Sequence, residues 1–340
     1  MSKTINWGIL GTSFISGVMA DAIKAQGQSQ IYAVAGRNTT TLAEFAAQYD
    51  IAHQFTDFDA LINDPLVDVI YIALPNHLHH EYVIKAANTG KAILCEKSLS
   101  VDMPSTIASL DAVKQNKVFF LEGLMYLAHP LIQQLSQTLA SGVIGEVKSI
   151  RGQYCAAISQ FVNPASLGAL FNLGCYPASL MQLVMQQQFG NNISQQYQLQ
   201  ATGRRGQDGN ICESTAIVTY SNGVQCHLHT AEDYGLHAGF TILGSLGSIE
   251  FTSNPWLPEA QGNHFSVRLY EQDAEVVNVE AKGNGFYYQV EAVLVALDNK
   301  QYTVPRPLAQ LQDSHDIMQI LTTWHQAALK SCAVDHTTKG

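Results

Sequence analysis

The sequence is poor in charge and lacks the features that mark several classes of protein. Only 14% of its 340 residues are charged, and no lysine- and arginine-rich run occurs in a chain of formal net charge −10. An acidic chain without a basic stripe binds nucleic-acid phosphates poorly, so nucleic acid is not an expected partner. No apolar run approaches the roughly 20 residues that span a bilayer, so no membrane segment is predicted.

Disulfide and export signals are also missing. The six cysteines include no Cys-x-x-Cys pair, and several lie inside apolar, strand-like segments. This pattern favours reduced, buried thiols. The first residues lack a basic segment followed by a long apolar stretch, so no signal peptide is predicted. We therefore expect a cytoplasmic protein.

Two domains are expected from the length and from an apolar content of 46%. In residues 1–122, strand-like segments alternate with helical ones, which predicts the parallel, doubly wound sheet of a Rossmann α/β domain. From residue 123 to 340 strands follow one another, and Asn222-Gly223 marks a hairpin, which predicts an α+β domain with an antiparallel sheet. Helices near 286–298 and 311–330 close the chain, and these last helices have the option of packing back on the first domain. The predicted strands are 5–10, 31–36, 67–74, 91–97 and 117–123, then 145–158, 211–220, 223–231, 238–243, 247–252, 265–271 and 274–280.

A turn suited to dinucleotide phosphates follows the first strand. Such a turn reads Gly-x-Gly-x-x-Gly, and here Gly11 is present while Ser13 and Ser16 occupy the other two places. Serine is small enough to let the backbone approach a phosphate at the helix N-terminus. An ordinary strand-to-helix turn would explain the same residues, so both readings stay open. The residues that would bind the cofactor here are Gly11, Thr12, Ser13, Phe14 and Ile15.

The end of the second strand bears on the choice of cofactor. An acidic residue there would hold the ribose 2′-hydroxyl of NAD, but the chain reads Gly36-Arg37-Asn38. A cation with a polar neighbour suits the 2′-phosphate of NADP(H), with NAD(H) as the less favoured cofactor. A solvated arginine at a strand end is the alternative.

Three further segments carry a resemblance to a known family: "ALPNHLHHEYVIKAANTGKAILCEKSLS" (73–100), "EGLMYLAHP" (122–130) and "GALFNLGCYP" (168–177). Together with Gly11 and "AVAGRN" they resemble the Gfo/Idh/MocA oxidoreductases, from about residue 4 to the C-terminal helices. The resemblance implies a Rossmann domain, a second domain with a large open sheet, and a homodimer or homotetramer formed through that sheet. It also implies hydride transfer between nicotinamide and a carbinol of a small sugar, polyol or cyclic diol.

The resemblance also assigns roles to residues. Glu96 and Lys97 match the Glu-Lys-Pro motif, whose lysine reaches nicotinamide and substrate. Tyr176 matches the residue that acts as acid and base, and Asn172 would position substrate. The loop after strand 67–74 would contact the cofactor through Leu74, Pro75, Asn76 and His79.

A lysine beside a tyrosine is chemically suited to this reaction. The Lys97 ammonium would stabilise a developing alkoxide, and a nearby cation makes a tyrosine with an ordinary pKa near 10 a usable acid and base. From the residues alone, a surface ion pair of Lys97 with Glu96 and a core position for Tyr176 are the plainer readings.

Two positions depart from the family pattern. Ser98 replaces the proline after the lysine, so we expect a trans Lys97–Ser98 bond unless its surroundings support a cis bond unusually well. Asn172 replaces an aspartate, and its amide carries no negative charge. These departures motivate an alternative function, a catalytically impaired NADP(H)-binding sensory or regulatory protein.

Several other polar residues drew attention. The histidines of "HLHH" (77–80) raise the idea of a metal, but a helix would point them in different directions, and we expect no metal. The residues considered for the substrate side, each with simple packing as the alternative, are Tyr126, His129, Tyr154, Tyr234 and His237.

Overall fold

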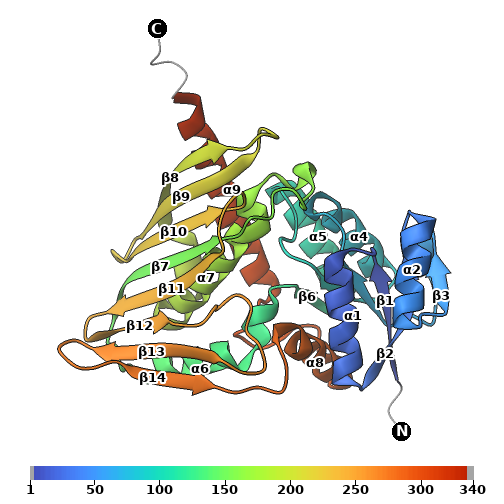
Figure 1. Ribbon diagram of the computed structural model, residues 1–340, viewed down its shortest axis with the longest axis horizontal. Helices are drawn as coiled ribbons and strands as arrows, with labels where there is room; N and C mark the ends of the chain where they lie inside the picture. The colour runs from blue at the N-terminus through green and yellow to red at the C-terminus, as the bar shows by residue number, and fades with distance from the viewer. Residues whose placement is uncertain (1–3, 335–340) are drawn as a thin grey trace. The chain divides into compact units, whose positions relative to one another are not determined.

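A computed structural model of the chain describes residues 4–334 and divides into two compact units. One comprises the residues up to Ala128 together with Gly285–His315, and the other comprises His129–Asn284 together with the residues from Asp316 onward. Each unit contains its own sheet (Figure 1). No helix in the described part of the chain is long and apolar enough to cross a membrane.

The first unit is built on a six-stranded sheet of order β3-β2-β1-β4-β5-β6 in which every pair is parallel. This confirms the predicted doubly wound sheet. Its central strands are fully buried, as their continuous β-branched and apolar sequences require. The strands are β1 (Ile5–Leu10), β2 (Ser29–Ala35), β3 (His53–Phe55), β4 (Val69–Ile72), β5 (Ala92–Cys95) and β6 (Phe120–Glu122).

Helices connect these strands, and α4 packs against α5 while α1 packs against α8. The chain ends several of them with left-handed residues, such as Gly27 at φ 76° after α1. Helix α8 comes from the C-terminal part of the chain but belongs to this unit. The helices are α1 (Phe14–Gln26), α2 (Thr39–Tyr49), α3 (Phe58–Ile62), α4 (Asn76–Asn88), α5 (Met103–Asn116) and α8 (Gly285–Asp298), with the 3₁₀ turn η1 (Met125–Ala128).

The second unit holds an eight-stranded sheet of order β14-β13-β12-β11-β7-β10-β9-β8. All neighbours are antiparallel except β7 and β10, which run parallel. The predicted open, mostly antiparallel sheet is therefore confirmed. The strands are β7 (Val147–Cys155), β8 (Tyr197–Arg205), β9 (Ile211–Tyr220), β10 (Gln225–Ala231), β11 (His237–Gly244), β12 (Gly247–Phe251), β13 (Asn263–Leu269) and β14 (Glu275–Val279).

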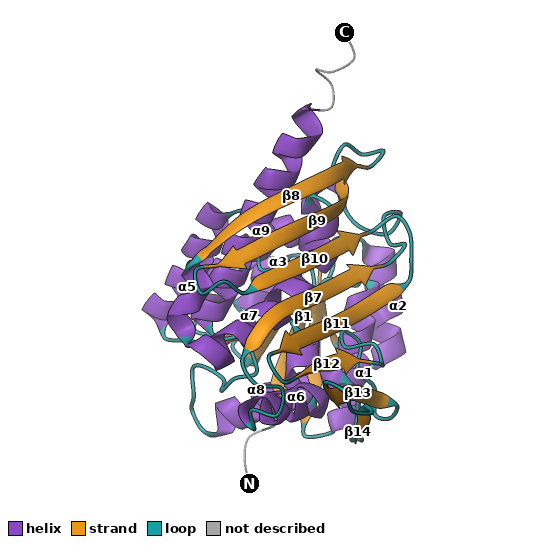
Figure 2. Ribbon diagram, turned by 90° about the vertical axis from the view of Figure 1, so that its left-hand side faces the viewer, coloured by secondary structure: helices purple, strands orange, loops and turns teal. Residues whose placement is uncertain are grey.

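Helices cover one face of this sheet, and the other is bare of described helices, as Figure 2 shows. Alternate residues of β9 and β10 are buried under the helices, and the residues between them are exposed. The Trp324 indole on α9 donates to Ser214 Oγ on β9 at 2.7 Å, which anchors that helix on the covered face. The helices of this unit are α6 (Pro130–Ala140), α7 (Cys175–Phe189) and most of α9 (Leu311–Val334), with short turns η2 (Pro164–Ser166) and η4 (Asn191–Gln195) and a π-helical segment η3 (Leu170–Gly174).

Candidate active site

In the first unit, the candidate cofactor crevice lies at the carboxyl ends of β1 and β4, where the strand order reverses. Gly11 follows β1 with φ +104°, a conformation that side chains other than glycine rarely adopt. A Cβ at this position would lie 2.7 Å from the carbonyl oxygen of Ala73, just past β4. Open α/β sheets bind their ligands at this kind of switch point. The glycine therefore keeps open the backbone approach that a pyrophosphate needs.

We predict that Gly11→Ala destabilises the protein more than Gly90→Ala does. Both glycines have positive φ, but a Cβ at Gly90 would meet nothing within 4 Å. The control should therefore cost about 1 kcal/mol of unfolding free energy, for conformation alone. The Gly11 variant should cost about 2 kcal/mol or more. Urea unfolding of the two variants measures this, and equal losses would contradict the steric argument.

The turn after Gly11 opens the first helix toward the crevice. Ser13 caps α1, and its backbone N–H donates to Ser16 Oγ at 3.2 Å. Phe14 begins the helix and is 86% exposed. Serine at the second and third motif positions thus permits the strand-turn-helix geometry that glycine gives elsewhere. The helix N-terminus presents N–H groups where an anion would bind.

Arg37 and Asn38, which follow β2, have different environments. Arg37 is exposed, and its charge, together with that of His80, lowers the pKa of His77 after the larger effect of burial. The Asn38 oxygen accepts from the N–H groups of Thr40 and Thr41 at 3.0 and 3.1 Å, so it caps α2. Of the two, Arg37 offers the solvent-facing side chain.

A buried histidine joins the two loops that follow β4 and β5. The His79 ring is 0% exposed, with Nδ1 2.8 Å from the carbonyl oxygen of Ser98 and Nε2 2.6 Å from that of Leu74. Burial lowers the pKa of His79 to about 4, so at neutral pH its single N–H donates to one carbonyl at a time. His79 therefore holds the loops carrying Pro75 and Lys97 together and does not face solvent.

The Lys97–Ser98 peptide bond is cis, contrary to the trans bond expected from the sequence. Tertiary contacts on both sides hold this turn: His79 contacts the Ser98 carbonyl, and the Leu99 N–H donates to Glu122 Oε1 at 3.1 Å. The local preference for trans took no account of these partners. Lys97 is half-buried on the turn, at the carboxyl end of β5.

Two buried carboxyls accompany Lys97. Glu96 is 6% exposed and accepts from the Tyr71 hydroxyl at 2.8 Å, so it is not a surface residue. Burial raises the pKa of Glu96, while the Lys97 charge opposes the rise. Burial also raises the pKa of Glu122 to about 7, with the Leu99 N–H and the Ser314 hydroxyl opposing it. Glu122 is thus a proton-holding group near the lysine turn.

In the second unit, Asn172 lies in the π-helical segment η3. Such segments are rare and frequently mark functional sites. Asn172 is 5% exposed, and its Nδ2 donates to Glu232 Oε2 at 2.7 Å. Gly168 leads into the segment with φ +89°, where a Cβ would lie 2.4 Å from the Ile211 carbonyl oxygen. Close packing against β9 therefore fixes where this segment begins.

Tyr176 stands in the first turn of α7, just after η3. Its ring meets that of Tyr154 edge-on at 5.1 Å and lies 6.0 Å from that of Trp256. It is 7% exposed, and Tyr154 has a pKa raised to about 12 by burial. Gly152 on β7 lets α7 come this close, because a Cβ there would lie 2.9 Å from Pro177 Cβ. Tyr176 and Asn172 thus share one end of the covered face of the sheet.

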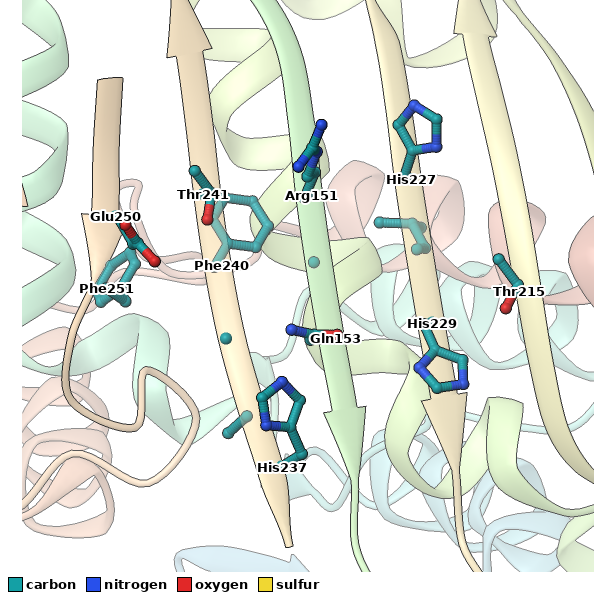
Figure 3. Close-up of a pocket in the computed structure, with 14 residues that line it drawn as sticks. Arg151, Gln153, Thr215, His227, His229, His237, Phe240, Thr241, Glu250 and Phe251 are labelled. Carbon is teal, nitrogen blue, oxygen red and sulfur yellow. The ribbon is translucent and has the colours of Figure 1, made fainter. Parts of the chain in front are cut away.

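Tyr234 and His237 lie on the opposite face of the sheet from Tyr154. The expectation that all three residues line the same substrate side was therefore wrong. His237 lines a groove of about 510 Å³ on the bare face of the sheet, together with Gln153 and His229 (Figure 3). Tyr234 donates to Glu213 on that bare face. Successive residues of a strand point to opposite faces, which places Gln153 there and Tyr154 on the covered face.

His129 and Tyr126 both occupy fully buried positions. His129 Nδ1 accepts from the Leu131 N–H at 3.1 Å and so caps α6, and Tyr126 is 0% exposed.

All six cysteines are free thiols, as the sequence predicted. Among residues 4–334, no three histidine, cysteine, aspartate or glutamate side chains gather as a metal ion would require.

The structure brings the loop residues of the first unit together at one sheet edge, and it brings Asn172 and Tyr176 together in the second. Sequence reasoning missed two buried carboxyls beside them, Glu122 and Glu232. Glu122 ends a predicted strand at the same edge as Lys97, which was an available signal. No signal in the sequence pointed to Glu232, because its partner Asn172 is 60 positions away.

Comparison with known proteins supplies the family. The N-terminal model "Oxidoreductase family, NAD-binding Rossmann fold" matches residues 5–124, and the GFO/IDH/MocA C-terminal domain matches residues 132–250. Trans-1,2-dihydrobenzene-1,2-diol dehydrogenase of Bos taurus is 25% identical over 325 residues, covering 93% of this chain and 95% of that protein.

Two solved structures share the fold. A 3-ketoreductase from Actinomadura kijaniata in complex with NADP has a TM-score of 0.81 and 22% identity, covering 96% of this chain and 98% of that one. A levoglucosan dehydrogenase in complex with NADH and levoglucosan has a TM-score of 0.80 and 19% identity, covering 97% and 98%. With both of its domains matched, the chain belongs to the Gfo/Idh/MocA family of NAD(P)-binding oxidoreductases.

Proposed function

We propose that the protein is an NADP(H)-dependent oxidoreductase that transfers a hydride between nicotinamide and a carbinol or carbonyl carbon of a sugar, polyol or cyclic diol. One observation carries this: the turn at Gly11, the loop at Leu74 and the turn at Lys97 meet at one sheet edge, tied by His79. Bound nicotinamide supplies the hydride donor or acceptor. The relatives named above act on a diol or a sugar derivative, as their names state.

The residues of the chain would manage the proton and the substrate. The Lys97 ammonium would stabilise negative charge on the reacting oxygen, and Tyr176 would give or take the hydroxyl proton. Asn172 would hold a substrate hydroxyl through its amide. The cofactor would be held by the turn after Gly11, by Arg37 and by the loop at Pro75 and Asn76. The buried Glu96 would support Lys97, its neighbour in the chain.

Arg37→Ala tests the preference for NADP(H). The Arg37 side chain is exposed and carries the positive charge that a 2′-phosphate would meet at the end of β2. The variant should bind NADPH about tenfold or more weakly, and NADH about as well as the wild type does. Titration of both nucleotides measures this, with Arg268→Ala on β13 as the control. An equal loss for both nucleotides would refute the 2′-phosphate contact.

A second candidate function is a catalytically impaired NADP(H)-binding sensory or regulatory protein. Ser98 and Asn172, which replace a proline and an aspartate of the family pattern, favour it. Tight NADPH binding without turnover on a panel of aldoses, polyols and diols would support it over the oxidoreductase.

We also propose that a second copy of the chain covers the bare face of the eight-stranded sheet, giving a homodimer or homotetramer. In the part of the chain that the structure describes, no helix packs on this face. A two-fold dimer would pair this face with the same face of a second copy, as an isologous contact requires.

A further inference from the structure

Glu232 is a buried carboxyl that the proposed reaction has not yet used. It directly follows β10 and is 2% exposed. Its backbone is held on both sides: its N–H donates to the Cys212 carbonyl at 2.9 Å, and its carbonyl accepts from Ile158 and Ser159, both at 2.8 Å. A carboxyl fixed in this way, away from water, needs partners that offset the cost of burial.

The hydrogen-bond partner of this carboxyl is Asn172. A carboxylate oxygen can only accept, so the Asn172 amide must turn its NH₂ group toward Glu232 Oε2, 2.7 Å away. This contact fixes which way the amide oxygen points, four residues before Tyr176 on the same helical run. Glu232 thereby decides what Asn172 presents to its surroundings.

We propose that Glu232 is a positioning residue of the reaction: it orients the Asn172 amide and supplies the negative charge that position 172 itself lacks. The inference rests on the proposed oxidoreductase function and deepens it. Together, Asn172 and Glu232 share one hydrogen bond and have one negative charge. An aspartate at position 172 would provide the same charge from the helical segment η3, whereas here the charge comes from Glu232, after β10.

Two other acidic residues lie near Glu232 and oppose its ionisation. Asp208, in the turn between β8 and β9, and Asp233, the next residue, are both acidic. Asp233 is already paired with Arg204 at 2.8 Å. These two carboxylates, together with burial as the largest cause, raise the pKa of Glu232, and the Asn172 amide opposes the rise. We therefore expect Glu232 to take up its proton at a higher pH than an ordinary glutamate does.

A cycle of three variants tests the inference: Glu232→Gln, Asn172→Asp and the double variant N172D/E232Q, with the exposed Glu275→Gln as the control. We measure kcat and KM against pH, and Tm against pH. Glu232→Gln should lower kcat/KM about tenfold or more and weaken the fall in activity at acid pH, because the carboxyl at position 232 can no longer be protonated. The control should follow the wild type.

The other two variants separate a charge effect from simple damage. Asn172→Asp places two carboxyls in contact, so one keeps a proton at neutral pH, and both Tm and activity should fall when that proton leaves at alkaline pH. N172D/E232Q restores one charge and one hydrogen bond with the residues exchanged. It should recover kcat/KM to within about threefold of the wild type.

Each result decides the matter. A wild-type pH profile and kcat/KM for Glu232→Gln, or a double variant as impaired as Glu232→Gln, would overturn the inference while the proposed function stands. If Glu232→Gln does not fold, the folded double variant and the alkaline Tm of Asn172→Asp decide in its place. No turnover by the wild type on the substrate panel would remove the proposed function and this inference with it.

Discussion

Lys97→Ala should lower kcat by about 10³-fold, roughly 4 kcal/mol of transition-state stabilisation, while NADPH affinity stays within about threefold. In the proposed reaction the ammonium would meet full negative charge only as the alkoxide develops, so its loss would be felt in the transition state and little in binding. Stopped-flow and steady-state turnover on an active aldose or diol, with NADPH titration, measure both quantities.

The matched control is Lys148→Ala on β7, whose lysine is half-exposed and paired with Glu146 at 2.8 Å. That variant should keep wild-type turnover, since a surface ion pair contributes little. Unchanged kcat in Lys97→Ala would remove the lysine from the mechanism. A large loss of NADPH binding would instead make it a cofactor residue.

Glu122→Gln should make the unfolding free energy less dependent on pH between about 4.5 and 7. The folded state raises the pKa of Glu122 from 4.5 to about 7, mainly by burial. Below the unfolded pKa, Glu122 is protonated in both the folded and the unfolded state, so its burial does not reduce stability. As pH rises toward the folded pKa, the unfolded state loses this proton before the folded state does, and this favours unfolding. The wild type therefore loses stability across this window, by as much as about 3 kcal/mol.

Glutamine removes that titration while its amide oxygen can still accept from the Leu99 N–H, which Glu122 holds at 3.1 Å. The variant should be the more stable protein at pH 8, with the difference shrinking toward pH 5. Because the Glu96 charge also raises the pKa of Glu122, the two carboxyls titrate partly as a pair. Urea unfolding at a series of pH values measures this, and parallel curves for variant and wild type would refute it.

Local sequence was enough for five of the six strands of the first sheet. A continuous β-branched run such as 67–74 can be stable only when buried on both faces, so the parallel sheet followed from pattern alone. Strand β8 was missed because its exposed residues alternate with only partly buried ones, which leaves a weak pattern. The three-residue β3 is too short to give a pattern at all.

The candidate site divides in the same way. Gly11 could be named from the turn that follows a predicted strand, whereas Lys97, which ends a predicted strand, was named from the resemblance to the family. The contacts that support these residues could not be predicted from the sequence. His79 reaches Ser98 across 19 positions and Glu122 reaches Leu99 across 23, and no spacing rule connects such pairs.

The sequence by itself determined most of the strands and helices in their order, the parallel Rossmann sheet, the turn at Gly11 and the motifs that indicate the family. Periodicity and turn chemistry are local, so they can be read along the chain. Only the tertiary structure decided the geometry of the Lys97–Ser98 turn and the pairing of Asn172 with Glu232. Those depend on burial and on partners distant in sequence, and a buried carboxyl acquires its pKa and its partner only when the chain has folded around it.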